Sequence, residues 1–383
     1  MSVEFPLSHK GLFRASPRQR STVLSPTLRQ ALFGRTVLGR IGRAAAAVAV
    51  GGIAAILAVQ AVAYAGAAPK GLMYDVGGGR RMRLVCEGPA DAGRPTVVYE
   101  SGAFGFSGDW ANVQPLVTAR GVRSCAYDRA GMGLSDPSSE PRDGVHVARD
   151  LEKLLAAAHV DGPLVLVGHS MAGSRLELFA ERNPGRVKGL VFVDTTPSEA
   201  MSDPIVRRYV TDFADDAHAA ARTAPFGILR LLAVTPLGDK VGLPPEESLE
   251  KRWQFGDPTY ERTAWLESRN WPLVAAQAIR SGPVDPRVPV AVITAGVPED
   301  AEGPRMQQVQ PAPALASDRG YVAVIPGATH HSILTAEYAP AVVKGIDFVV
   351  RAAMRPNLGR ARVATVFEGQ TMTATQDAGR ARD

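Results

Sequence analysis

A serine in a turn of small residues is the first candidate for chemistry in this 383-residue chain. The apolar run Leu-Val-Leu-Val at 164–167 leads directly into Gly168-His169-Ser170-Met171-Ala172, and a helix-forming segment covers 175–182. A short apolar run of this kind is typical of a buried parallel strand. The small residues on either side permit a sharp strand-to-helix turn, which holds the hydroxyl of Ser170 above the edge of a sheet. The motif therefore predicts nucleophilic attack by Ser170.

Two further motifs join this turn in a resemblance to a known family. They are Glu100-Ser101-Gly102 with the following Trp110, and the segment Cys-Ala-Tyr-Asp-Arg-Ala-Gly-Met-Gly-Leu-Ser-Asp at 125–136. Together with the turn at 168–173, which has Ala172 where Gly is usual, they resemble the α/β-hydrolase superfamily over residues 72–351. Within it they are similar to bacterial serine hydrolases of the esterase and meta-cleavage-product hydrolase type. Haloalkane dehalogenases and α/β-type epoxide hydrolases have a carboxylate at this turn, so the serine argues against them.

The resemblance also implies the partners of Ser170, which needs a base and a group that orients the base. His330 stands where the superfamily places its histidine, although spacing leaves the adjacent His331 open. The acid is expected to be Asp194, after the predicted strand 189–193. Glu299, with Asp300 beside it, is the alternative, because it follows the strand 288–294 that more often carries the acid.

Two backbone amides are implied as the oxyanion hole, those of Ala103 and Met171, because a developing oxyanion needs preorganised N–H donors. Asp128 and Arg129 are interpreted as scaffold, an ion pair and turn at the end of a strand.

Strands that alternate with helices must position these residues, which predicts a mostly parallel sheet covered on both faces. The resemblance implies eight strands, helices on both faces and a helical cap. The core is expected over 69–196 and 289–355, and a hairpin over 72–86 begins it. Residues 197–288 interrupt the alternation with helical patterns and many prolines, and are assigned to the cap.

The N-terminal region predicts a membrane segment. Residues 44–68 contain one clearly polar side chain, Gln60, and are long enough to span the hydrocarbon core. Eight basic residues precede them against Glu4 alone, so residues 1–43 are predicted to be a flexible basic cytoplasmic tail. This orientation makes the catalytic domain extracytoplasmic, on an uncleaved signal anchor. Secretion after cleavage at Ala63-Tyr64-Ala65 is the alternative. Residues 356–383 lack periodicity and are expected to be a disordered tail.

Composition excludes other functions. The net charge is +5, but residues 1–43 carry about +7, so the rest is slightly acidic and a nucleic-acid surface is not expected. Neither a metal-ligand cluster of Cys and His nor a phosphate-binding glycine loop occurs, so no metal or cofactor is expected. Cys86 and Cys125 fall on the second and fourth predicted strands, which neighbour each other in the usual strand order of this fold. They are predicted to form a disulfide, which an oxidising compartment would permit, and two inert buried thiols are the alternative.

These observations predict a membrane-anchored serine hydrolase, carboxylesterase-like or lipase-like, that acts on a small-molecule ester through an acyl-enzyme. A C–C bond hydrolase and a cofactor-free haloperoxidase are alternatives with the same residues. A catalytically silent binding protein of the same fold is a third.

Overall fold

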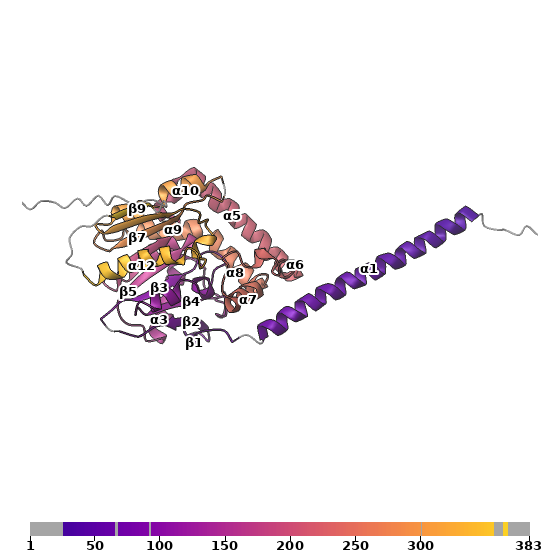
Figure 1. The fold of residues 1–383 in the computed structure, drawn as a ribbon, viewed down its shortest axis with the longest axis horizontal. Coiled ribbons are helices and arrows are strands. Elements are labelled where there is room, and N and C mark those ends of the chain that lie inside the picture. Colours follow the sequence, from indigo (N-terminus) through magenta and orange to yellow (C-terminus); the bar gives the residue numbers. More distant parts are fainter. Residues whose placement is uncertain (1–25, 66–67, 92, 300, 356–362, 367–383) are drawn as a thin grey trace, which may run out of the picture. The chain divides into compact units, whose positions relative to one another are not determined.

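The computed structural model describes residues 26–65, 68–91, 93–299, 301–355 and 363–366. Its central element is a sheet in the order β1-β2-β4-β3-β5-β6-β7-β8-β9 (Figure 1). The antiparallel part consists of the hairpin β1 (Leu72–Asp75) and β2 (Arg81–Glu87) and the pairing of β2 with β4 (Ser124–Tyr127). All the other pairs are parallel. The parallel strands are β3 (Thr96–Glu100), β5 (Leu164–His169), β6 (Val187–Val193), β7 (Val290–Ala295), β8 (Gly320–Ile325) and β9 (Val363–Val366).

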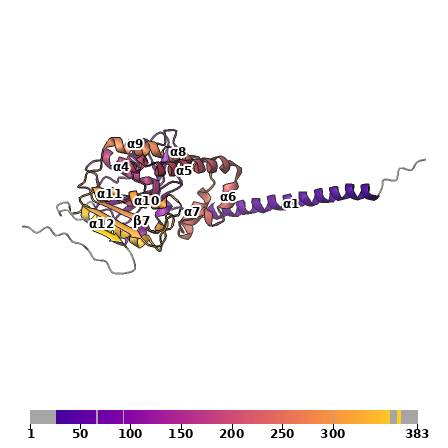
Figure 2. The same cartoon turned by 90° about the horizontal axis from the view of Figure 1, so that it is seen from above.

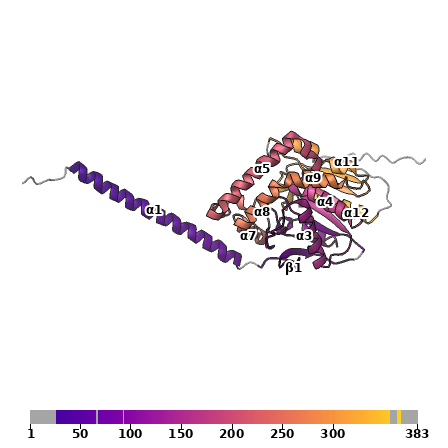
Figure 3. The same ribbon diagram turned by 180° about the vertical axis from the view of Figure 1, so that it is seen from behind.

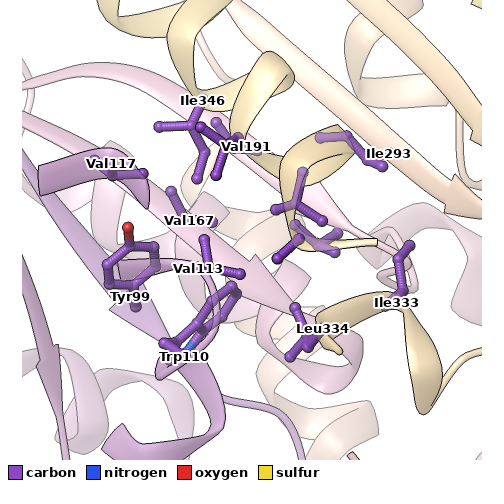
Figure 4. Close-up of a cluster of buried hydrophobic side chains, with 14 of the residues drawn as sticks. Tyr99, Trp110, Val113, Val117, Val167, Val191, Ile293, Ile333, Leu334 and Ile346 are labelled. Carbon is purple, nitrogen blue, oxygen red and sulfur yellow. The ribbon is translucent and has the colours of Figure 1, made fainter. Parts of the chain in front are cut away.

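Side-chain alternation divides the core between the two faces of the sheet. Val165 and Val167 of β5 belong to one buried cluster, with residues of α2 (Gln114–Thr118) and α12 (Ala339–Ala353). Leu164 and Leu166 belong to the other, with α3 (Gly144–Ala157) and α4 (Gly173–Arg182). Figure 2 shows α4 and α12 on opposite sides of the sheet, and Figure 4 shows part of the first cluster around Tyr99, Trp110 and Val167. Because both faces are covered, the strands read as continuous apolar runs, as the sequence predicted.

Helices fill the long connection between β6 and β7. They are α5 (Pro204–Thr223), α6 (Ile228–Leu232), α7 (Pro245–Gln254), α8 (Pro258–Arg269) and α9 (Trp271–Ser281). The prolines that interrupt the pattern stand at helix starts, where a missing N–H is tolerated. Asp203 and Asp257 cap α5 and α8 by accepting backbone N–H groups. α5 and α8 pack side by side (Figure 3). Two shorter helices, α10 (Gly303–Val309) and α11 (Ala312–Ala316), follow β7.

The N-terminal helix α1 spans Pro26–Ala65, and its segment Gly39–Val62 is long and apolar enough to cross a membrane, with a mean hydropathy of 2.2. The expected flexible tail is therefore wrong for residues 26–43, which continue the helix. These residues include good helix formers such as Leu, Ala, Arg and Gln, and Pro26 suits the first helical position. Residues 1–25 lie outside the described part of the chain.

The expected eight strands are present as β1–β8, and a ninth strand extends the sheet at the opposite edge, within the segment 356–383 for which disorder was expected. The segment Val-Ala-Thr-Val at 363–366 pairs in parallel with β8, and its β-branched residues favour a strand. The rest of that tail lies outside the described residues.

The predicted disulfide is present. Cys86 and Cys125 face each other directly in the register of β2 and β4, and their Sγ atoms are bonded. The bond joins the antiparallel part of the sheet to its parallel part.

Candidate active site

The turn after β5 holds Ser170 in a conformation that few side chains adopt. Its φ is 60°, in the left-handed region, and α4 begins three residues later. Gly168 is required at the end of the strand, because a Cβ there would lie 2.8 Å from Leu176 Cδ1 and 2.9 Å from Ala172 Cβ. The turn therefore presents the hydroxyl at the carboxyl end of the sheet, as the motif predicted.

His330 lies within hydrogen-bond distance of both Ser170 and Asp194. Its Nε2 is 3.0 Å from Ser170 Oγ, and its Nδ1 is 2.6 Å from Asp194 Oδ2. Since a carboxylate only accepts, Nδ1 carries a hydrogen, and Nε2 is the nitrogen that can take the serine proton. Ser170 and Asp194 directly follow β5 and β6, and His330 stands in the loop after β8, so the three residues meet at the carboxyl end of the parallel strands. This arrangement can remove a proton from the serine hydroxyl during nucleophilic attack.

Asp194 is fixed by its backbone and its neighbours. Its φ is 48°, and its Oδ1 accepts the Ala295 N–H from β7 at 2.9 Å. Burial alone would raise the pKa of Asp194, but the hydrogen bond and charge of His330 and the Ala295 amide outweigh it, so the pKa lies below its ordinary value. The carboxylate therefore stays ionised opposite the imidazole.

The alternative base and acid form a separate pair. His331 Nδ1 lies 2.7 Å from Glu299 Oε2, at a more exposed position than the His330–Asp194 pair. The structure thus brings His330 and Asp194 to Ser170 and brings His331 to Glu299. Asp300 lies outside the described residues.

His169, to which the sequence analysis gave no role, contacts His330. Its ring stacks on that of His330 with centroids 4.6 Å apart, and its Nε2 donates to the His330 carbonyl at 3.1 Å. Burial and the neighbouring His330 lower the pKa of His169 to about 3, so its ring is neutral and packs as a flat support. In the sequence, only the position of His169 next to Ser170 could have indicated this contact with His330.

The loop after β3, which contains Ala103, lies against the nucleophile. A Cβ on Gly102 would come within 2.7 Å of Ser170 Cβ, so only glycine allows this approach. Met171, the other expected oxyanion residue, follows Ser170 directly and is buried. Both residues expected to supply oxyanion amides therefore lie close to the serine in the chain or in space. Ala103 follows Gly102, which packs against Ser170, and Met171 follows Ser170 itself.

A cavity of about 270 Å³ opens onto Ser170 and His330. Tyr209 of α5 and Trp271 of α9 line it, so helices of the connection between β6 and β7 form part of its wall. Met306 and Gln307 of α10 and Glu299 also line it, so the lining combines apolar and polar side chains. A cavity of this composition suits a small organic molecule.

Comparisons with known proteins identify the fold. A family profile for the alpha/beta hydrolase fold matches residues 95–225. An uncharacterised protein of Schizosaccharomyces pombe is 39% identical over 98 residues, which are 26% of this chain and 18% of that protein. Methylesterase 1 of Arabidopsis thaliana is 27% identical over 122 residues, 31% of this chain and 46% of that protein. The chain thus matches less than half the length of these relatives.

A solved structure shares the fold over a greater length. A variant of an epoxide hydrolase from Vigna radiata aligns with 73% of this chain and 98% of its own, with a TM-score of 0.55 and 18% identity. At this identity the similarity describes the fold, and the chemistry must be argued from the site.

Proposed function

We propose that this protein, which has the α/β-hydrolase fold, is a serine hydrolase that cleaves a carboxylic ester with Ser170, His330 and Asp194. The observation that carries the proposal is the unbroken chain of hydrogen bonds from Ser170 Oγ through both ring nitrogens of His330 to Asp194. A serine rather than a carboxylate at the turn favours acyl transfer over epoxide hydrolysis, the reaction after which the Vigna radiata protein is named.

The reaction proceeds in two halves. Ser170 Oγ attacks the ester carbonyl carbon while its proton passes to His330 Nε2, and the amides of Ala103 and Met171 receive the oxyanion. Collapse of this intermediate breaks the bond to the alkoxide, which leaves as an alcohol with the proton from His330. A water then attacks the acyl-enzyme, His330 takes its proton, and the carboxylic acid departs as Ser170 recovers its hydrogen. Asp194 stabilises the imidazolium in both halves.

The cavity supports a small ester with an apolar acyl or alcohol group. Tyr209, Trp271 and Met306 offer contact to such a group within about 270 Å³. The similarity to a protein named as a methylesterase agrees with a small alcohol part. We infer that the helices between β6 and β7 act as a cap that selects the substrate.

Labelling with a fluorophosphonate tests the chemistry. We expect wild-type protein to be labelled and to hydrolyse p-nitrophenyl esters, with preference for short chains, and Ser170→Ala to lose the label and at least about 1,000-fold of its activity. Ser174→Ala, on a buried serine of α4, is the control and should keep the label. Absence of label in folded wild-type protein would favour a silent binding scaffold instead.

We also propose that residues 39–62 anchor the protein in a membrane, with the catalytic domain on the extracytoplasmic side. The apolar length of this segment, the basic residues before it and the disulfide between Cys86 and Cys125 support the proposal.

Protease treatment of intact and lysed spheroplasts of an expressing bacterium tests the orientation. An outward domain is degraded in intact spheroplasts, whereas a cytoplasmic domain is degraded only after lysis. Full-length protein that appears in the wash without membranes would show that the segment does not anchor it.

A further inference from the structure

We propose that Arg129 is a positioning residue that aims the Ala103 amide at the oxyanion, an inference that rests on the proposed hydrolase function. The sequence suggested only a scaffold role for this arginine, which follows β4. Its side chain is 1% exposed, yet it lies beside the loop after β3 that touches the nucleophile.

The guanidinium of Arg129 binds the two carbonyls that precede Ala103. Nη1 donates to the Ser101 carbonyl at 2.7 Å, and Nη2 donates to the Gly102 carbonyl at 2.8 Å. Two charge-assisted bonds from one planar group fix both peptide units, because the guanidinium donors are held in a rigid fork.

The Gly102 bond determines where the next amide points. Peptide bonds among the described residues are trans, so the Gly102 carbonyl and the Ala103 N–H belong to one peptide plane and point in opposite directions. The carbonyl faces Arg129, and the N–H is therefore directed away from it. Gly102 itself lies against Ser170, since an added Cβ would be 2.7 Å from Ser170 Cβ. Rotation of this peptide plane would turn the donor away from the developing charge.

Two buried carboxylates hold Arg129 in place. Glu100 Oε1 accepts from Arg129 Nη1 at 3.0 Å and also from Arg175 Nη1 of α4 at 3.0 Å. Glu267 of α8 accepts from Arg129 Nε at 2.9 and 3.1 Å. Burial alone would raise the pKa of Glu267, but Arg129, Arg175 and Arg142 outweigh it and lower the pKa to about 2. A permanent charge on the cap thus fixes the orientation of the arginine.

Kinetics of Arg129→Lys test the proposal, because a lysine keeps the charge but cannot hold both carbonyls and both carboxylates. Removal of one oxyanion donor typically lowers kcat about 100- to 1,000-fold. We expect kcat for a p-nitrophenyl ester to fall at least 30-fold while KM changes less than threefold. Affinity for a boronic acid that mimics the tetrahedral intermediate should fall in parallel with kcat/KM, whereas inhibition by the carboxylate product should not change.

Arg83→Lys is the matched control. Arg83 is 2% exposed and is also held by two carboxylates, Asp128 at 2.7 Å and Glu250 at 2.5 Å, but no hydrogen bond joins its side chain to residues 101–105. It should lose thermal stability while kcat and boronic acid affinity stay within threefold of wild type. An equal loss of kcat in both variants would show that replacing either buried arginine lowers kcat by the same amount. That result would overturn the proposal.

If Arg129→Lys does not fold, Glu267→Gln tests the positioning role of Arg129 instead. It leaves Arg129 in place but removes the charge that orients it, so kcat should fall several-fold at constant KM. Unchanged kcat and boronic acid affinity in every folded variant, with active wild-type protein, would overturn the role of Arg129 and leave the hydrolase intact. Wild-type protein that neither reacts with a fluorophosphonate nor hydrolyses esters would instead overturn the proposed function.

Discussion

Left-handed backbone conformations gather at the candidate site. Ser170, Asp194 and Phe104 have φ values of 60°, 48° and 51°, and among the described residues His159 is the one other non-glycine residue with positive φ. Each such conformation costs roughly 1–3 kcal/mol and persists where the surroundings enforce it. Ser170 and Asp194 directly follow β5 and β6, and Phe104 lies in the loop after β3, where the chain turns sharply beside the nucleophile. Strain at these three residues is therefore tied to the geometry of the site.

The identity of the acid gives a prediction at this scale. Asp194→Asn should lower kcat about 1,000- to 10,000-fold, because an amide no longer stabilises the imidazolium and favours the wrong tautomer. Glu299→Gln should cost less than about tenfold, since Glu299 lines the cavity and holds His331 rather than His330. Rates with p-nitrophenyl acetate, together with circular dichroism of both variants, check this. A larger loss in Glu299→Gln would assign the acid to Glu299.

The parallel sheet explains which helices and strands could be predicted from the sequence and which could not. Strands buried on both faces, such as β5 and β6, are continuous apolar runs and were found almost to their ends. β9 was missed because a run of four residues is too short to show a periodic pattern. The acid stayed open because β6 and β7 are neighbours, so residues after either strand can reach the same histidine.

The contact between α8 and the arginines near the candidate site could not be predicted from the sequence. Glu267 lies on α8 among residues without strong periodicity, and a carboxylate in such a helix is usually solvated. Its burial depends on three arginines from distant segments, which only the folded chain brings together. Ser170 and His330 could be proposed from the sequence because Ser170 directly follows β5 and His330 stands in the loop after β8.

At the scale of the whole molecule, a buried acid predicts how stability depends on pH. Glu177 of α4 is 9% exposed, and burial raises its pKa to about 8, although Ser198 donates a hydrogen bond to it. The folded protein therefore holds a proton that the unfolded chain releases near pH 4.5. Its contribution to the free energy of unfolding is complete below that pH and is lost as the pH rises toward 8.

Glu177→Gln should remove this dependence, since the amide stays neutral. We expect the variant to exceed wild type in Tm at pH 8 by several degrees and to differ little at pH 5. Thermal unfolding followed by circular dichroism at both pH values measures this, with Glu246→Gln, on an exposed residue of α7, as the control. A gain that is equal at both pH values would exclude a titration of Glu177.

The order of the site residues along the chain governs when activity arises during biosynthesis. Ser170 and Asp194 precede the connection between β6 and β7, and His330 follows it, 160 residues after the serine. At about 5–20 residues per second, the ribosome reaches the histidine codon roughly 10–30 s after the serine codon. Throughout that interval the emerging polypeptide has the proposed nucleophile without its base, so the proposed ester hydrolysis cannot begin until most of the chain has been synthesised.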